Sequence, residues 1–341
     1  MASAAGFDRL KSDLKNGSIG KFYILHGQED YLRRYYFDLL RKELLDELTE
    51  SFNFHHITSE NMSLRLLFDS VEALPMMAQR SLVQLEDIDL FALNEDDRTK
   101  LTQLLTDLPE HCCLVATYAD FKADKRKKKL WEAIEKNAVI AEFPYQSEHD
   151  LCAWIARHVR AHGKQIDREL CMYLLSRCGM SMTRLHNEIE KLCAYSDASE
   201  IVRADIDAVV SPTLEAVVFE ISDALAQRNF DRALERLHTI LLLHAEPIAV
   251  LAAIGAQMRR LHAAKLLLAE GKSAELAAVC GIAPYAAKKT LSQAQRLSQA
   301  FCEQAVLLCC ETDVKLKTSA GDPRQLLQML ILSLAQEAQH D

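Results

Sequence analysis

The sequence predicts an α/β domain with a five-stranded parallel sheet, followed by two blocks that are helical throughout. Up to about residue 143, short apolar runs alternate with amphipathic stretches. The runs are apolar on both faces, which is typical of parallel strands covered by helices. No convincing strand appears after Ser147. The 341 residues include only 10 Gly and 7 Pro, so the composition favours helix over most of the chain.

The first block, residues 1–144, contains all the predicted strands. They are Phe22–His26, Phe54–Thr58, Ser81–Glu86, Cys113–Tyr118 and Val139–Phe143. Amphipathic stretches between these runs predict helices over Tyr31–Leu48, Leu64–Leu74, Asn94–Leu105 and Asp124–Ile134. Pro144 follows the last predicted strand and marks the end of this α/β block.

The second block, residues 145–211, predicts a small helical domain. Ser147 is typical of an N-cap, and it precedes an apolar pattern that runs through Trp154 to His162. Asp167 is predicted to begin the next helix, and Leu185–Tyr195 lies in a third. Ser211 and Pro212 mark the following break.

The third block, residues 212–341, is predicted to be helical from end to end. Its first helices are Leu214–Gln227 and Phe230–His244. Pro247 suits the first position of a long helix, because its missing N–H costs nothing there. Three or four more helices follow, up to Gln339.

Composition and charge exclude several classes of function. The chain has 40 Lys and Arg against 49 Asp and Glu, a net charge of −9. This charge argues against a protein that coats nucleic acid without partner proteins. The sequence has no secretory h-region and no membrane-length apolar run. Its ten cysteines include no C-x-x-C, which predicts reduced core thiols in a cytoplasmic protein. The twelve histidines show no metal-ligand spacing, so we expect no metal and no cofactor.

The turn after the first strand has the outline of a phosphate-binding corner without its ligands. A working P-loop needs several glycines, a lysine and a hydroxyl at this strand-to-helix turn. Here Gly27 is followed by Gln28, Glu29 and Asp30, which put two acidic residues where phosphates would lie. Leu82–Asp87 resembles a Walker B strand with paired acids at its end. Without a phosphate cradle, we interpret that end as solvated and expect no nucleotide at the corner.

Two other features indicate binding. Leu74-Pro75-Met76-Met77 connects a predicted helix to the third strand. Because proline disfavours α geometry in the residue before it, the helix should stop at Leu74. The residues alone favour core filling by Met76 and Met77, although an adaptable pair on a turn also suits insertion into a partner's hydrophobic pocket.

The second feature is a run of five cations, Lys125-Arg126-Lys127-Lys128-Lys129. Asp124 is predicted to cap the helix that carries them. Positive charge near a helix N-terminus opposes the macrodipole, so local stability does not explain the run. A phosphate backbone or an acidic partner would explain it, and a solvated face is about equally compatible with the sequence.

The order of these features resembles the delta subunit of the bacterial DNA polymerase III clamp loader, over nearly the whole chain. The resemblance rests on segments spread along the sequence: Tyr23–Leu32, Ala73–Leu82, Asp124–Lys128, Gly179–Leu192, Phe219–Leu225, Glu246–Ile248 and Asp313–Thr318.

This resemblance implies an AAA+-like domain with a degenerate P-loop, a helical lid domain and a helical collar domain for oligomerisation. It implies a hetero-pentameric loader with gamma/tau motor subunits and a delta-prime subunit, acting on the sliding beta clamp and primed DNA within the polymerase III holoenzyme. No intrinsic activity is expected of this chain. The family's clamp contact maps onto Met76 and Met77, supported by Leu74, with Ala78 or Arg80 as neighbours that share the role. The family commonly has an aromatic residue or a leucine in the pair, and here both are methionine.

Two alternatives to the clamp-loader function stay open. One is an ATPase whose phosphate site uses unfamiliar residues. The other is a stand-alone DNA-binding adaptor of similar architecture, for which tight DNA binding without partners would be required.

Overall fold

The computed structural model describes residues 2–242, 245–282, 284–318 and 321–339. These residues form two compact units, one running to Ser147 and including Ser181–Thr183, the other containing Glu148–Met180 and the chain from Arg184 onward. Each unit is considered by itself. The division of the chain at residues 144 and 211 stays a prediction.

The first unit contains a five-stranded parallel sheet in the order β2-β3-β4-β1-β5. Its strands are β1 (Phe22–His26), β2 (Phe54–Thr58), β3 (Ser81–Glu86), β4 (Cys112–Tyr118) and β5 (Val139–Glu142). Ile24 of β1 lies opposite Ala116 of β4 on one side and Ile140 of β5 on the other. The five predicted strands are thereby confirmed, with two ends displaced by one residue.

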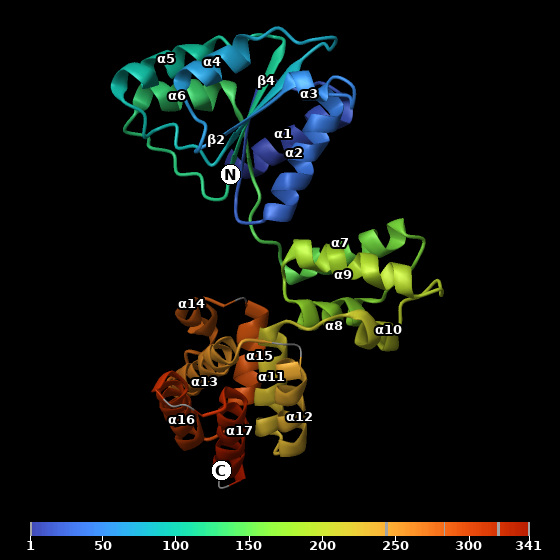
Figure 1. Ribbon diagram of the computed structural model, residues 1–341, viewed down its shortest axis with the longest axis vertical. Helices are drawn as coiled ribbons and strands as arrows, with labels where there is room; N and C mark the ends of the chain where they lie inside the picture. The colour runs from blue at the N-terminus through green and yellow to red at the C-terminus, as the bar shows by residue number, and fades with distance from the viewer. Residues whose placement is uncertain (1, 243–244, 283, 319–320, 340–341) are drawn as a thin grey trace. The chain divides into compact units, whose positions relative to one another are not determined.

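Helices cover both faces of this sheet (Figure 1). They are α1 (Ala2–Asn16), α2 (Asp30–Leu44), α3 (Glu50–Asn53), α4 (Leu64–Glu72), α5 (Glu95–Thr106) and α6 (Lys128–Asn137). Because side chains alternate along a strand, Ile24 packs into the core beneath α4, α5 and α6, whereas Leu25 packs into the core that α1 and α2 share. The α/β class and the parallel sheet are confirmed.

Several helices of this unit differ from prediction: α3 was not predicted, α4 ends at Glu72 rather than Leu74, and α6 starts at Lys128 rather than Asp124. Helix α1 was not predicted, and it packs along β5 so closely that a Cβ at Gly6 would lie 1.8 Å from the carbonyl oxygen of Ile140. The predicted helix Tyr31–Leu48 ends at Leu44 instead, where the next residue, Leu45, is extended and buried. Amphipathic periodicity continues past that point, but core packing of Leu45 interrupts the helix.

The second unit is helical, as predicted. Its helices are α7 (Glu148–Ala161), α8 (Arg168–Cys178), α9 (Met182–Tyr195), α10 (Arg203–Val209), α11 (Leu214–Ala226), α12 (Phe230–Leu242), α13 (Pro247–Ala269), the short 3₁₀ turn Ser273–Glu275, α14 (Leu276–Cys280), α15 (Pro284–Ala294), α16 (Gln299–Thr318) and α17 (Pro323–Gln339). The first two residues of α9 cluster with the first unit. The end predicted for α12, at His244, lies outside the described residues.

Capping residues set several of these helix starts. The side chain of Asp167 accepts a hydrogen bond from the N–H of Leu170 at 2.7 Å, so it caps α8 as predicted. Pro247 occupies the first turn of α13, also as predicted. From α11 onward, the helices share one hydrophobic core, to which Ile254 and Leu334 contribute fully buried side chains.

Eight of the ten cysteines are buried, as expected for core thiols. Burial raises the pKa of the Cys113 thiol to about 12, so this thiol stays protonated at neutral pH. Among the described helices, none is both long and apolar enough to cross a membrane.

Candidate functional site

The connection between α4 and β3 presents apolar side chains to solvent. Leu74 is 77% exposed, Met76 56% and Met77 93%. The preference for core filling, which the residues alone suggested, is therefore wrong for both methionines. Helix α4 ends at Glu72, just ahead of Pro75, and the chain between them turns outward. An exposed cluster of large apolar side chains on one turn is typical of a protein-binding surface.

The backbone of this turn is held in place by groups far away in the sequence. Met77 has a φ of +55°, which is uncommon for a residue with a side chain. The side chain of Asn53, at the end of α3, accepts a hydrogen bond from the N–H of Met76 at 2.7 Å and donates one to its carbonyl oxygen at 2.9 Å. Sequence reasoning missed Asn53, because 23 residues of chain separate the two partners.

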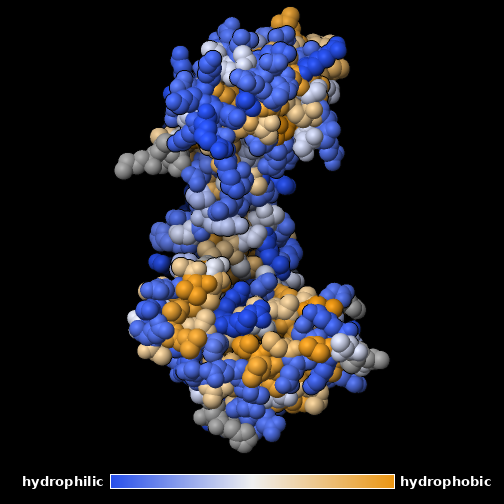
Figure 2. Space-filling model, turned by 90° about the vertical axis from the view of Figure 1, so that its left-hand side faces the viewer, coloured by the Kyte–Doolittle hydropathy of each residue, from blue (hydrophilic) through white to orange (hydrophobic). Residues whose placement is uncertain are grey.

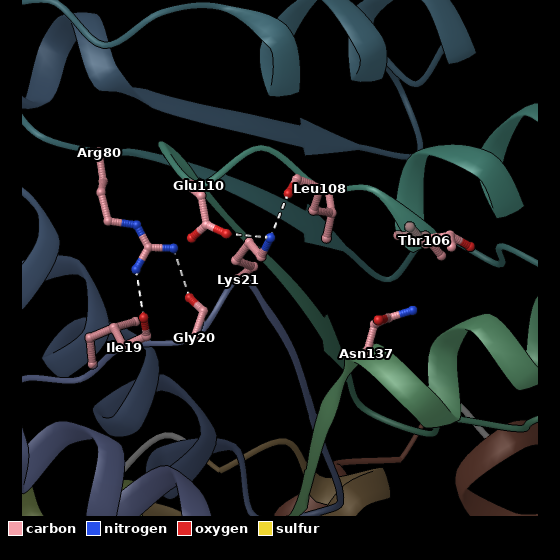
Figure 3. A pocket seen from close by; sticks show the side chains of 9 residues that line it. Ile19, Gly20, Lys21, Arg80, Thr106, Leu108, Glu110 and Asn137 are labelled. Atoms are coloured by element: carbon pink, nitrogen blue, oxygen red, sulfur yellow. Dashed lines mark hydrogen bonds and ion pairs between the residues drawn. The ribbon is translucent and has the colours of Figure 1, made fainter.

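Arg80 fixes the downstream end of the same connection. Its guanidinium donates to the carbonyl oxygens of Ile19 at 2.7 Å, Gly20 at 2.8 Å and Cys112 at 3.0 Å. Figure 3 shows this side chain directed at Ile19 and Gly20 rather than outward. Arg80 therefore anchors the turn, and its share in a partner contact stays a prediction. Ala78, its other named neighbour, is half-buried.

A pocket of about 490 Å³ lies beside Arg80, where strands β1, β3 and β4 begin. Lys21 reaches into it, and its ammonium donates to the carbonyl oxygen of Leu108 at 2.9 Å and to Glu110 at 2.8 Å (Figure 3). The pairing with Lys21 lowers the pKa of the Glu110 carboxyl. Lys21 and Arg80, the two cationic side chains of this pocket, both donate hydrogen bonds to other groups of the chain.

The phosphate-like corner is closed by its own backbone contacts. The N–H of Gly27 donates to Tyr118 O at 3.2 Å, and the N–H of Glu29 donates to Phe143 O at 2.9 Å. A P-loop turns such N–H groups toward phosphate oxygens. Gly27 has a φ of +128°, and a Cβ there would lie 2.3 Å from Phe143 O. A glycine is needed at position 27 because the backbone of the corner packs directly against Phe143.

The two acidic side chains at the corner are buried or paired within the chain. Gln28 is exposed, whereas Glu29 is only 4% exposed, and burial raises the pKa of its carboxyl. Asp30 pairs with Arg33 at 2.6 Å and with Arg34 at 2.9 Å. The cavity bordered by these arginines and the end of β3 has a volume of about 40 Å³. This small cavity lies beside the corner, and no residue from Gly27 to Asp30 lines it.

The paired acids at the end of β3 are also engaged. Glu86 lies 2.6 Å from the Nε2 atom of His56 on the neighbouring strand. Asp87 accepts a hydrogen bond from the N–H of Ala119 at 3.0 Å and has a φ of +51°. In the described part of the chain, no group of three or more His, Cys, Asp or Glu side chains is arranged to hold a metal ion.

The basic run straddles the start of α6, with Lys125, Arg126 and Lys127 ahead of the helix and Lys128 and Lys129 inside it. Asp124 does not cap this helix, contrary to prediction, because its carboxylate accepts from the backbone N–H of Arg126 at 3.1 Å and from that residue's Nε at 2.8 Å. Lys127 is the N-cap, so only Lys128 and Lys129 lie in the first turn, where both are exposed. Lys125 is exposed as well, with its ammonium 5.7 Å from the centre of the Trp131 ring. The run therefore presents three exposed lysines that carry no carboxylate partner among the ion pairs found in the described residues.

Two family profiles match this chain. The profile described as DNA polymerase III, delta subunit, matches residues 23–144. The profile described as DNA polymerase III delta subunit, C-terminal domain, matches residues 215–334.

Individual relatives agree with these profiles. The DNA polymerase III subunit delta of Bacillus subtilis (strain 168) is 26% identical over 337 residues, which cover 96% of each chain. The probable DNA polymerase III subunit delta of Aquifex aeolicus (strain VF5) is 19% identical over 255 residues, 74% of this chain and 73% of that protein. Among solved structures, the Bacillus subtilis DNA clamp loader delta protein shares the fold with a TM-score of 0.70 at 24% identity, over 96% of this chain and 99% of that one. The resemblance inferred from the sequence motifs is confirmed, and the chain belongs to the DNA polymerase III delta subunit family.

Proposed function

We propose that this chain binds the sliding beta clamp through Leu74, Met76 and Met77, and opens it for loading onto primed DNA without hydrolysing ATP itself. The observation that carries the proposal is the exposure of these three side chains on one anchored turn. Membership of the delta subunit family supplies the setting, a clamp loader.

The energy for opening would come from burial of apolar side chains at the clamp. Transfer of a Met or Leu side chain from water into an apolar pocket contributes about 1.5–3 kcal/mol. Met77 and Leu74 are nearly as exposed as side chains can be, so they have most of their surface available to bury. A ligand shifts an equilibrium only by its differential affinity, so the turn must bind the open ring more tightly than the closed ring.

The closed corner supports the second half of the proposal, that this chain does not hydrolyse ATP. The N–H groups of Gly27 and Glu29 are bonded to carbonyl oxygens of the chain, so they are not available to bind a phosphate. ATP bound by the gamma/tau motor subunits would then control access to the turn. In this arrangement, the chain is the clamp-binding and clamp-opening subunit of a hetero-pentamer that also contains delta-prime.

Exposed apolar side chains on the second unit are consistent with assembly with those partner subunits. Figure 2 shows hydrophobic side chains gathered in patches on its surface. Exposed apolar residues include Leu307 and Val314 on α16 and Met329 and Leu332 on α17. These side chains lie on the helices assigned to the collar, and we propose that the collar uses them against neighbouring subunits.

A binary clamp pull-down tests the clamp contact. The full chain, the double variant Met76→Ser, Met77→Ser and the control Met329→Ser are each mixed with sliding clamp. Met329 is 59% exposed, close to the 56% of Met76, but lies on α17. We expect loss of clamp recovery only for the double variant. Equal recovery from all three samples would remove the methionine pair from the clamp contact.

A further inference from the structure

We propose that Asn53 is a positioning residue for clamp binding: its buried side-chain amide presets the Met76–Met77 turn in the conformation that the clamp receives. This inference rests on the proposed function, because it assigns a role within the same contact. It adds a residue that makes no contact with the clamp and that lies in another element of the fold.

Asn53 is well placed to hold the turn. Its side chain is 1% exposed, and it forms a two-point contact with the backbone of Met76, through the N–H at 2.7 Å and the carbonyl oxygen at 2.9 Å. A side-chain amide offers one acceptor and two donors. The contact therefore satisfies both backbone groups of Met76 as a neighbouring strand would.

The amide is itself held rigidly. Its nitrogen also donates to the carbonyl oxygen of Thr49, the N-cap of α3, at 2.9 Å. Asp46 fixes the start of that helix, because its carboxylate accepts from the N–H groups of Leu48 at 3.0 Å and Thr49 at 2.9 Å. Asn53 is thus the end of a chain of hydrogen bonds that begins at Asp46.

The turn requires such an external support. Met77 adopts a φ of +55°, a region that side chains with a Cβ disfavour, and its own side chain is 93% exposed, with little packing to hold it. The fixed points nearest to it are Met76, bonded to Asn53, and Arg80, bonded to three carbonyl oxygens. Without the first of these, the exposed methionines lose their upstream anchor.

Preorganisation of this kind strengthens binding without any added contact, since ordering the turn no longer opposes association. Asn53 contacts only the backbone of Met76, so the support does not depend on which side chain stands at position 76. The side chain is thereby free to suit the clamp, while the turn keeps its conformation. Asn53→Ala should weaken clamp binding by about tenfold, the factor expected when the backbone of about one further residue must be ordered on binding.

Two measurements on the full chain test this inference, with Ser63→Ala as the matched control. Ser63 caps the other end of α4, where its hydroxyl accepts from the N–H of Leu66 at 3.1 Å, so its loss destabilises the same region without touching the turn. Hydrogen exchange of the Met76 amide, followed by NMR, reports directly on the bond to Asn53. Clamp affinity is measured in parallel by surface plasmon resonance.

The inference expects fast Met76 exchange and about tenfold weaker clamp binding in Asn53→Ala, with neither change in Ser63→Ala. Equal weakening in both variants would show a merely structural role and overturn it, as would wild-type affinity in Asn53→Ala. If Asn53→Ala does not fold, Asn53→Ser replaces it, because its hydroxyl keeps a polar group in the buried site but is too short to bond both groups of Met76. A wild-type chain that fails to bind the clamp would instead overturn the proposed function, and the exchange data would still show whether Asn53 holds the turn.

Discussion

Arg33 donates a hydrogen bond from its guanidinium to the carbonyl oxygen of Gly27 at 2.7 Å, and a second from the same nitrogen to Tyr118 O at 3.1 Å. One cation of α2 therefore ties the turn after β1 to the end of β4. In a P-loop, a cation at this corner faces phosphate oxygens. Here it faces backbone carbonyls, and its other terminal nitrogen pairs with Asp30.

The first prediction concerns nucleotide binding. Titration of the pure chain with a fluorescent ATP analogue and Mg²⁺ should give no saturable signal, because Glu29 and Asp30 repel phosphates at a corner already filled by Arg33. Arg33→Ala should not create a site, since both acids remain. Saturable, Mg²⁺-dependent binding by the wild-type chain would favour the ATPase alternative.

The second prediction concerns Gly27. Gly27→Ala should lower the free energy of unfolding by about 3 kcal/mol or more, because the new Cβ would meet Phe143 O at 2.3 Å in a backbone conformation of φ +128°. Gly163→Ala is the control. That glycine also has a positive φ, +74°, but nothing lies within 4 Å of its Cβ position. Its substitution should cost only about 1–2 kcal/mol in urea denaturation, and equal losses would contradict the packing argument.

The third prediction concerns pH. Burial raises the pKa of the Glu29 carboxyl in the folded chain, so its contribution to stability is present at low pH and is lost as pH rises through that folded pKa. Glu29→Gln should therefore gain stability over the wild type at about pH 8 and little at about pH 4. Chemical denaturation at both pH values measures the difference.

Glu110 provides a control of opposite sign for this experiment. Its hydrogen bond to Lys21 lowers the pKa of its carboxyl, so its contribution is present above the unfolded pKa and is lost as pH falls. Glu110→Gln should therefore be neutral or destabilising at about pH 8. A gain of stability in both variants at that pH would point to a general effect of lowering negative charge.

The fourth prediction concerns the basic run. In the assembled loader, the double variant Lys128→Ala, Lys129→Ala should weaken DNA binding at every sequence. It should also lower the slope of log affinity against log salt by about 0.9 for each phosphate that the protein no longer neutralises. Lys100→Ala with Lys42→Ala removes two exposed lysines from the same unit and should leave the slope unchanged. An unchanged slope in the first variant would assign the run to a solvated face.

Local sequence patterns predict the sheet and most of the helices. Each strand is a short apolar run, and the apolar faces that Ile24 and Leu25 bury are visible in the periodicity. Asp167 and Pro247 marked their helix starts because capping acts within a few residues. The sequence also shows that the lysine and the hydroxyl of a P-loop are missing after Gly27, because a phosphate-binding loop is a local motif.

Tertiary structure alone decided what the candidate site presents. Asn53, which is distant in sequence, bonds the backbone of Met76, and the guanidinium of Arg80 turns inward to carbonyl groups of two other segments. The helix predicted to start at Asp124 starts later, because the carboxylate of that residue bonds Arg126 instead. Periodicity shows which side chains are apolar. Whether an apolar side chain on a turn is buried or exposed depends on the segments that the fold places next to it.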